Sequence, residues 1–293
     1  MTLGSFDPRF REPACLFWGI GAQKAGTTWL HHYLASHPDV KVPALFKEQH
    51  YWTSVRPPYH AHVLPKTRLG RINERVRLEI LSRIRRDSTT QEWAARQRAI
   101  AVPRADHRDH ATALFAGWQD ETAVGEITPA YALLSPAVFG EMAALSDRSR
   151  FIFIMRDPVS RALSAARMYH NQNPAGGSVA DRLEQALSGT DTLLVDQSSY
   201  DRTLDALDTA IATDRVAYFF YETLFDQTEV DRLCAFLGIA PHPAQTENVV
   251  FSFKSEDDAA LPKELLKRLE QRLQPAYAAV RNRFGNKVPL GWR

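Results

Sequence analysis

A group of small, basic and hydroxyl-bearing residues stands near the N-terminus, in the stretch GAQKAGTTWL at positions 21–30. A lysine in such a stretch supplies a mobile positive charge, and small residues let the backbone close on a ligand. Threonines at a helix start add hydroxyl and backbone N–H donors, where the helix dipole also favours an anion. These features predict a site for a tetrahedral anion, formed by Lys24, Ala25, Gly26, Thr27 and Thr28.

The position of the lysine separates this loop from the Walker A loop of kinases and NTPases. In the pattern G-x-x-x-x-G-K-[ST], the lysine directly follows the second glycine. Here Gly21 and Gly26 have the required separation, but Thr27 follows Gly26 and the lysine is Lys24. Asp157 is the candidate for an acidic Mg²⁺ ligand after a strand, but its neighbours fit another motif better. A P-loop nucleotide kinase or NTPase is therefore the alternative interpretation.

A second candidate anion site lies in RDPVSRALS, residues 156–164. Arg156 follows the apolar run of a strand, and Pro158 favours the first turn of the next helix. Arg156 and Ser164, with Arg161 one turn earlier, offer a fork of N–H donors and a hydroxyl to a phosphate. Two phosphate sites at two strand ends fit a nucleotide with phosphates at both ends of its ribose.

Strands and helices alternate along the chain. Apolar runs predict strands at 16–21, within 122–131 up to a turn at Pro129, within 150–158, and at 215–222. Helical patterns lie at 27–38, 159–170 and 262–284, the last bent or broken near Pro275. This order predicts an α/β protein with a P-loop-like three-layer fold and a mainly parallel central sheet covered on both faces. Ligands bind such sheets outside the carboxyl ends of the strands. No linker interrupts residues 1–293, which predicts a single domain.

The two candidate anion sites together resemble a known family. GAQKAGTTWL resembles the 5′-phosphosulfate loop of sulfotransferases, and RDPVSRALS resembles their 3′-phosphate motif, R-x-P-x-x-R-x-x-S. The resemblance implies a sulfotransferase that uses 3′-phosphoadenosine 5′-phosphosulfate (PAPS) as the donor and requires no metal. It further implies that Lys24, Ala25, Gly26, Thr27, Thr28, Trp29, Arg156 and Ser164 bind the donor.

Two further stretches narrow the resemblance to the heparan-sulfate-type branch and its bacterial relatives. KEQHYW at 47–52 is similar to the K-E-x-H-aromatic stretch of that branch, and GEITPAY at 125–131 is similar to its E-K-T-P-x-Y element. This resemblance implies that Glu48 is the general base and that Lys24 neutralises the departing oxygen. His50 is the rival base. The implied substrate contacts are Lys47, His50, Thr128 and Tyr131.

Three positions depart from the family pattern. Ile127 stands where the relatives have a lysine, so that a cation is missing or is supplied from elsewhere, for instance by Lys47. The stretch 248–262 is acidic and lacks the usual Lys-Gly signature of the donor-closing loop. Phe251 or Phe253 in it is the candidate to stack on adenine, and Lys254 the candidate to meet the 3′-phosphate. The helix after Ser164 lacks the tyrosine often found two residues later.

Composition and charge exclude few partners. The net charge is +2 and the hydrophobic fraction is 44%, as in ordinary soluble proteins. Two distant cysteines make no disulfide framework, no metal-type spacing appears, and the charged N-terminus does not resemble a signal peptide. We therefore expect a cytoplasmic protein without a transmembrane segment. Oligomeric state is not indicated.

Residues 56–118 form a basic insertion with 13 Lys and Arg against 6 Asp and Glu. The pattern predicts two or three exposed helices, which are either a solvated insertion or a basic wall. A basic wall would attract an anionic acceptor or a lipid headgroup at an anionic membrane surface. Few aromatic residues and no reading motif argue against nucleic acid. We therefore expect the acceptor to be a hydroxyl-bearing glycan, lipid headgroup or small alcohol. The second alternative to an active sulfotransferase is a catalytically inactive nucleotide-binding protein.

Overall fold

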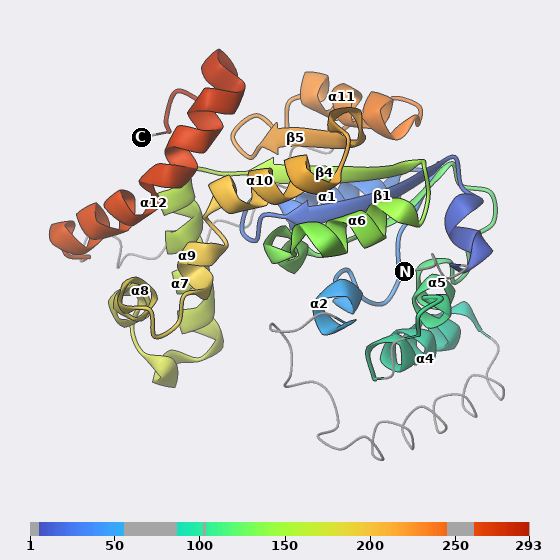
Figure 1. The fold of residues 1–293 in the computed structure, drawn as a ribbon, viewed down its shortest axis with the longest axis horizontal. Helices are drawn as coiled ribbons and strands as arrows, with labels where there is room; N and C mark the ends of the chain where they lie inside the picture. Colours follow the sequence, from blue (N-terminus) through green and yellow to red (C-terminus); the bar gives the residue numbers. More distant parts are fainter. Residues whose placement is uncertain (1–5, 56–86, 102–103, 245–260, 293) are drawn as a thin grey trace.

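The computed structural model describes residues 6–55, 87–101, 104–244 and 261–292 of the chain (Figure 1). Five strands form one sheet in the order β2-β3-β1-β4-β5, and every neighbouring pair is parallel. The strands are β1 (Cys15–Gly21), β2 (Val40–Lys41), β3 (Ala123–Ile127), β4 (Ser149–Met155) and β5 (Val216–Phe220). The predicted parallel α/β sheet is confirmed.

Burial explains why these runs form central strands. Every residue of β1 and of β3 is buried, and β4 is buried at all but one position. Strands covered on both faces have near-continuous apolar sequences, because neither face contacts water. The run FIFIM in β4 is such a sequence, since each of its residues is fully buried.

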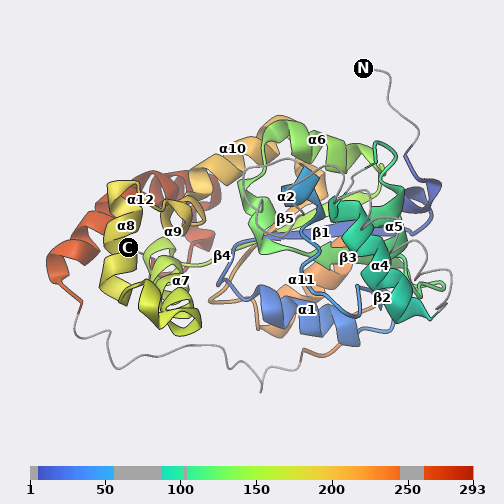
Figure 2. The same cartoon turned by 90° about the horizontal axis from the view of Figure 1, so that it is seen from below.

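The helices lie on both faces of the sheet and beyond its ends. Figure 2 shows α6 and α10 on one face and α1 and α11 on the other, so the predicted three-layer arrangement is confirmed. The helices are α1 (Thr27–Ser36), α2 (Tyr51–Val55), α4 (Ser88–Ala101), α5 (Arg108–Leu114), α6 (Pro136–Ala144), α7 (Pro158–Gln172), α8 (Val179–Ser188), α9 (Leu193–Asp196), α10 (Tyr200–Ala210), α11 (Gln227–Leu237) and α12 (Lys263–Phe284). Helices α7, α8, α9 and α12 gather together at one end of the molecule (Figure 2).

The C-terminal helix is not broken at Pro275. Helix α12 is continuous from Lys263 to Phe284, with Pro275 inside it, and Figure 1 shows it as a bent helix. An internal proline removes one backbone hydrogen bond, which neighbouring packing can compensate. Here Leu269, Leu273 and Tyr277 bury one face of the helix, and α12 contacts α7, α8 and α10.

The described part of the basic insertion is packed against the protein through α4 and α5, although Arg104 and Arg108 are 45% and 62% exposed, so the prediction of exposed helices is only partly confirmed. In α4, Ala94, Ala95, Ala99 and Ile100 are buried, and α4 packs on α5. The described part of the insertion carries equal numbers of basic and acidic residues. The four arginines are Arg96, Arg98, Arg104 and Arg108, and the four acids are Asp87, Glu92, Asp106 and Asp109. The charge surplus therefore lies in 56–86, which is outside the described residues together with part of the predicted helices.

Close strand pairing gives a stability prediction at Gly125. A Cβ atom at this position would lie 2.1 Å from the carbonyl oxygen of Phe17 in the adjacent strand β1. The backbone oxygen of a central strand has little room to move, so we predict that Gly125→Ala lowers the free energy of unfolding by about 2–3 kcal/mol. Gly140→Ala in α6 is the control, because a Cβ atom there meets nothing within 4 Å. Urea unfolding should show the control unchanged or slightly more stable, and equal effects of both substitutions would contradict the prediction.

Candidate active site

The predicted anion-binding loop connects the carboxyl end of β1 to α1. Lys24 and Gly26 in it have positive φ angles of 66° and 89°. Gly26 precedes α1, and a Cβ atom there would lie 3.0 Å from Leu224 and 3.1 Å from Tyr221. Left-handed backbone and close approach together explain the glycine. The turn places the loop over the N-terminus of α1, where backbone N–H groups lack partners within the helix.

A cavity of about 260 Å³ lies beside this loop. All its main contributors follow the carboxyl ends of strands, as expected for a parallel sheet. Basic, acidic and hydroxyl-bearing side chains in its lining include Lys24, Thr27, Thr28, Lys47, Glu48 and Arg156. Aromatic side chains in its lining include Trp29, Tyr33, Tyr221 and Phe225. With Pro129, the structure brings together residues from all four of the stretches that sequence analysis selected, 21–30, 47–52, 125–131 and 156–164.

Three cationic side chains meet at the cavity. Lys47 Nζ donates to the hydroxyls of Thr27 and Thr28 at 3.3 and 3.4 Å. Arg156 donates from Nη1 to the carbonyl oxygen of Lys24 at 3.3 Å, and its guanidinium lies 4.6 Å from the ring centre of Tyr221. Burial, followed by the charges of Arg156 and Lys47, lowers the pKa of Lys24. Such a cluster favours an anion, because an anion would relieve both the repulsion and the lost hydration.

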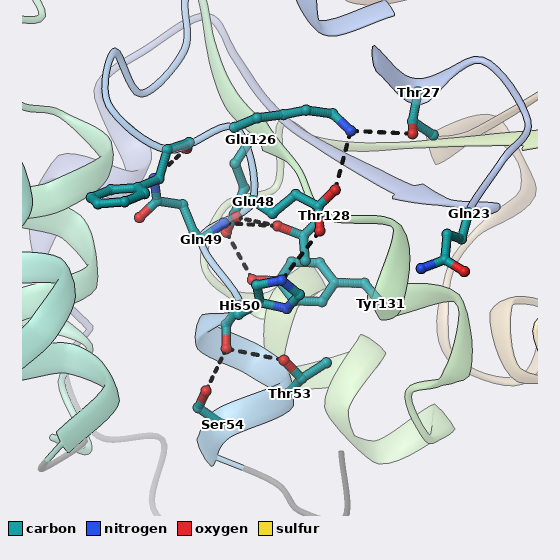
Figure 3. A network of polar contacts seen from close by, with 12 residues as sticks. Gln23, Thr27, Glu48, Gln49, His50, Thr53, Ser54, Glu126, Thr128 and Tyr131 are labelled. Atoms are coloured by element: carbon teal, nitrogen blue, oxygen red, sulfur yellow. Dashed lines mark hydrogen bonds and ion pairs between the residues drawn. The ribbon is translucent and has the colours of Figure 1, made fainter. Parts of the chain in front are cut away.

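Among the described residues that line the cavity, Glu48 is the one carboxylate, and it lies between two basic side chains (Figure 3). Lys47 Nζ is 3.2 Å from its Oε1, and His50 Nε2 is 3.2 Å from its Oε2. Burial raises the pKa of Glu48, but the hydrogen bond of His50 and the charge of Lys47 together outweigh burial, and the pKa is lowered. The side chain is 39% exposed, so it is accessible from the cavity. His50 is not part of that lining.

Thr128 and Tyr131 do not line the cavity, and their role as substrate contacts stays a prediction. Both are completely buried, and both donate from their hydroxyls to the carboxylate of Glu126, at 2.9 and 3.1 Å. The Thr128 hydroxyl in turn accepts from the backbone N–H of Gln49 at 3.0 Å (Figure 3). The Tyr131 hydroxyl accepts from the N–H of Trp52 at 3.4 Å. These residues support the segment that carries Glu48.

The departure at Ile127 has a packing reason. Ile127 is fully buried, and a Cβ atom at Gly19 would lie 2.7 Å from its Cγ1. A lysine side chain at this position would have to replace an apolar one that packs against β1. The nearby cation comes from Lys47, whose Nζ reaches the loop threonines.

The second motif is divided between the cavity and the interior. Arg156 lines the cavity, whereas Ser164 is buried in α7 and is not in the lining, so its role as a donor contact stays a prediction. Arg161 is also fully buried, and burial lowers its pKa to about 10. It donates to the Ser198 hydroxyl at 2.5 Å and to the carbonyl oxygens of Leu194 and Gln23. Through the carbonyl oxygen of Gln23, Arg161 supports the loop after β1 from the interior of the protein.

Sequence analysis selected Trp29 but missed the other aromatic side chains of the cavity lining, Tyr33, Tyr221 and Phe225. Tyr221 directly follows β5, and Phe225 lies between β5 and α11. Trp29 stacks on Tyr33 with ring centres 5.4 Å apart and meets Phe225 edge-on at 5.2 Å. The rule that ligands bind at carboxyl ends of strands could have found Tyr221. Ala25 is completely buried, so it shapes the loop from inside. The predicted contacts Phe253 and Lys254, and the alternative Phe251, lie outside the described residues.

Metal and membrane features were searched in the described parts of the chain. Within residues 6–55, 87–101, 104–244 and 261–292, there is no group of three or more His, Cys, Asp or Glu side chains that could hold a metal ion. In the same ranges, no helix has the length and the apolar character needed to cross a membrane. Cys15 and Cys234 are both buried and unpaired with each other.

The fold and the cavity define an α/β protein of the P-loop-like class, with an anion loop after its first strand. Residues 17–243 match the Sulfotransferase family, and the chain belongs to that family. The resemblance deduced from the motifs is thereby confirmed.

Solved structures agree in fold. A sulfotransferase from Alicyclobacillus acidocaldarius has a TM-score of 0.63 at 20% identity, over 92% of this chain and 95% of that chain. A sulfotransferase from Mycobacterium avium has a TM-score of 0.52 at 15% identity, over 96% of this chain and 79% of that chain. No protein with a curated description matches the sequence. At these identities the similarity to the solved structures shows the fold alone.

The contacts of Glu48 give a prediction for its titration. Removing the His50 imidazole leaves burial opposed mainly by Lys47, so His50→Asn should raise the pKa of Glu48. NMR titration of the Glu48 carboxyl, assigned with Glu48→Gln, measures this change. His170→Asn is the control, since its ring contacts the carbonyl oxygen of Gly177 instead. A Glu48 pKa that stays the same or falls in His50→Asn would contradict the prediction.

Proposed function

We propose that the protein transfers the sulfuryl group of PAPS to the hydroxyl of an acceptor. The observation that carries this proposal is that Lys24, Arg156 and Glu48 line one cavity at the carboxyl edge of the sheet. Family membership makes sulfuryl transfer the chemistry to expect. The three side chains then account for the two ends of the donor and for the acceptor proton.

The donor is proposed to bind with its phosphosulfate on the loop. Lys24, Lys47 and the hydroxyls of Thr27 and Thr28 would hold this end, at the N-terminus of α1. Arg156, whose carbon chain and guanidinium are ordered by Tyr221 and by the Lys24 carbonyl, would hold the 3′-phosphate. The adenine would lie against the aromatic lining, because flat apolar rings stack on aromatic side chains. Trp29, Tyr221 and Phe225 are the candidates.

The proposed reaction is an in-line displacement at sulfur. The acceptor oxygen forms a bond to sulfur while the bond between sulfur and the 5′-phosphate oxygen breaks. The acceptor proton passes to the carboxylate of Glu48, and the electron pair of the broken bond stays on the phosphate oxygen. Lys24 and Lys47 would stabilise that developing charge, and the step needs no other reactant.

Glu48 is proposed as the base in preference to His50. Glu48 lines the cavity, whereas His50 contacts Glu48 Oε2 from the side at 3.2 Å. His50 would therefore orient the carboxylate and keep it ionised. A low pKa makes Glu48 a weak base at rest, so the proton transfer would follow sulfur–oxygen bond formation, when the acceptor oxygen becomes acidic.

Two alternatives remain testable beside this proposal. A P-loop kinase or NTPase lacks support because Thr27, and not a lysine, follows Gly26. A catalytically inactive nucleotide-binding protein would bind the donor product without turnover. We further propose that the chain acts as one sulfotransferase domain in the cytoplasm on a hydroxyl-bearing glycan, lipid headgroup or small alcohol, and not on nucleic acid.

Nucleotide binding tests the proposed donor site. We expect 3′,5′-adenosine bisphosphate, but not ATP with Mg²⁺, to raise the thermal unfolding temperature of the wild type by several degrees. A ligand at 100 times its dissociation constant adds about 2.7 kcal/mol. Arg156→Ala should lose the shift, and the control Arg202→Ala should keep it, because the Arg202 side chain is 63% exposed and pairs with Asp196. Stabilisation by ATP with Mg²⁺ alone would favour the kinase interpretation.

Turnover of a Glu48 variant tests the proposed role of Glu48 as the base. Glu48→Gln keeps the shape of the side chain but cannot accept the proton, so turnover should fall about 10²- to 10⁴-fold while bisphosphate binding persists. Turnover is measured as bisphosphate release with a panel of hydroxyl acceptors. Glu264→Gln, at an exposed position in the first turn of α12, is the matched control. Near wild-type turnover in Glu48→Gln would show that another group takes the proton.

A further inference from the structure

The segment that carries Glu48 has no regular secondary structure of its own. Residues 42–50 connect β2 to α2 without a helix or strand. A loop of this kind keeps a fixed course only when its backbone groups find partners elsewhere. Gln49 and Trp52 find such partners in Thr128 and Tyr131, which lie beneath the segment. The part before Glu48 needs a separate support.

Helix α4 supplies this support through Glu92. Its carboxylate accepts from the backbone N–H of Ala44 at 2.8 Å through Oε2 and from that of Leu45 at 2.9 Å through Oε1. Glu92 is only 1% exposed, although it belongs to the insertion that sequence analysis expected to be exposed. Charge-assisted bonds to two successive N–H groups fix the direction of the loop at this point.

One turn further along α4, Arg96 holds the same segment closer to Glu48. Its Nη2 donates to the backbone carbonyl oxygen of Glu48 at 3.2 Å. Its guanidinium also lies over the ring of Phe46, 4.4 Å from the ring centre. Residues four positions apart share one face of a helix, so Glu92 and Arg96 act on the segment from the same side.

The helix that carries these two residues is itself anchored. Arg98 Nε donates to Asp109 of α5 at 3.1 Å, and both side chains are buried. His110 of α5 contacts the Glu126 carboxylate at 3.0 Å, which ties the helix pair to β3. The insertion thus connects the sheet to the segment before Glu48.

We propose that Glu92 and Arg96 are positioning residues, which hold residues 44–48 so that the Glu48 carboxylate faces the cavity. This inference rests on the proposed role of Glu48 as the base. In this arrangement the described part of the insertion serves the reaction by fixing the base, and two of its arginines, Arg96 and Arg98, make contacts inside the protein. A misplacement of a reacting group by about 1 Å can cost about 100-fold in rate.

The test compares Arg96→Gln with Arg108→Gln, which removes an arginine of the same insertion whose side chain is 62% exposed and lies beside Asp106. Arg96→Gln should lower kcat about 10- to 100-fold at an unchanged KM for PAPS. Arg96→Lys, which keeps a donor, should recover part of the loss. Arg108→Gln should keep kcat within about threefold of the wild type, because its side chain pairs with Asp106 instead. Similar losses of kcat in the two glutamine variants, or a full rate in Arg96→Gln, would overturn the proposal.

Hydrogen exchange of the backbone separates this proposal from the proposed function. Glu92→Gln should speed exchange at the amides of Ala44 and Leu45 at least about tenfold, and Arg108→Gln should leave both amides protected. Unchanged protection of these amides in Glu92→Gln would overturn the proposed role of Glu92. If Glu92→Gln loses this protection but the wild type shows no turnover, Glu92 holds the segment and the proposed function is wrong. Wild-type turnover that is kept in full by Arg96→Gln would overturn the positioning role alone.

Discussion

Mutual repulsion among cations is the constraint on which the site depends. Lys24, Lys47 and Arg156 line one cavity, and burial together with the neighbouring positive charges lowers the pKa of Lys24. Side chains that repel one another and lose water stay together only when a rigid frame holds their backbones. The frame exists in the order of the strands. Because β1 and β4 are neighbours and parallel, the loop after β1 and the turn after β4 lie at the same edge.

Buried polar groups make that frame rigid. Arg161 bonds the backbone behind the anion loop, and the Tyr200 hydroxyl donates to the carbonyl oxygen of Arg156 at 2.8 Å. On the next turn, Asp157 accepts from the N–H of Ser160 and from the hydroxyl of Tyr277 in α12. These hydrogen bonds fix the backbone of the loop after β1 and of the turn that carries Arg156. Each such bond satisfies a group that would otherwise be costly to bury.

The acidic side chains have two distinct tasks. Glu126 and Glu92 are both buried. Glu92 accepts directly from the segment before Glu48, whereas Glu126 acts through Thr128 and Tyr131, whose hydroxyls accept from Gln49 and Trp52. Glu48 itself remains accessible between Lys47 and His50. Carboxylates of the same chemical type thus differ in role because burial and partners differ. The buried ones fix a loop, and the accessible one can exchange a proton with a bound molecule.

The sequence alone was sufficient for the parallel α/β fold, the sulfotransferase family and the two anion motifs, because strand burial and strand-to-helix junctions leave local patterns. It also placed Lys24, Glu48 and Arg156 in one site, whose donor and acceptor roles stay predictions. Tertiary structure alone decided that Thr128 and Tyr131 support the segment around Glu48, that Ser164 is buried, and that Tyr221 and Phe225 complete the cavity. The physical reason is that a motif fixes residue types and spacing. Which side of an element faces a cavity depends on partners distant in sequence, such as the helix α4 that holds the segment before Glu48.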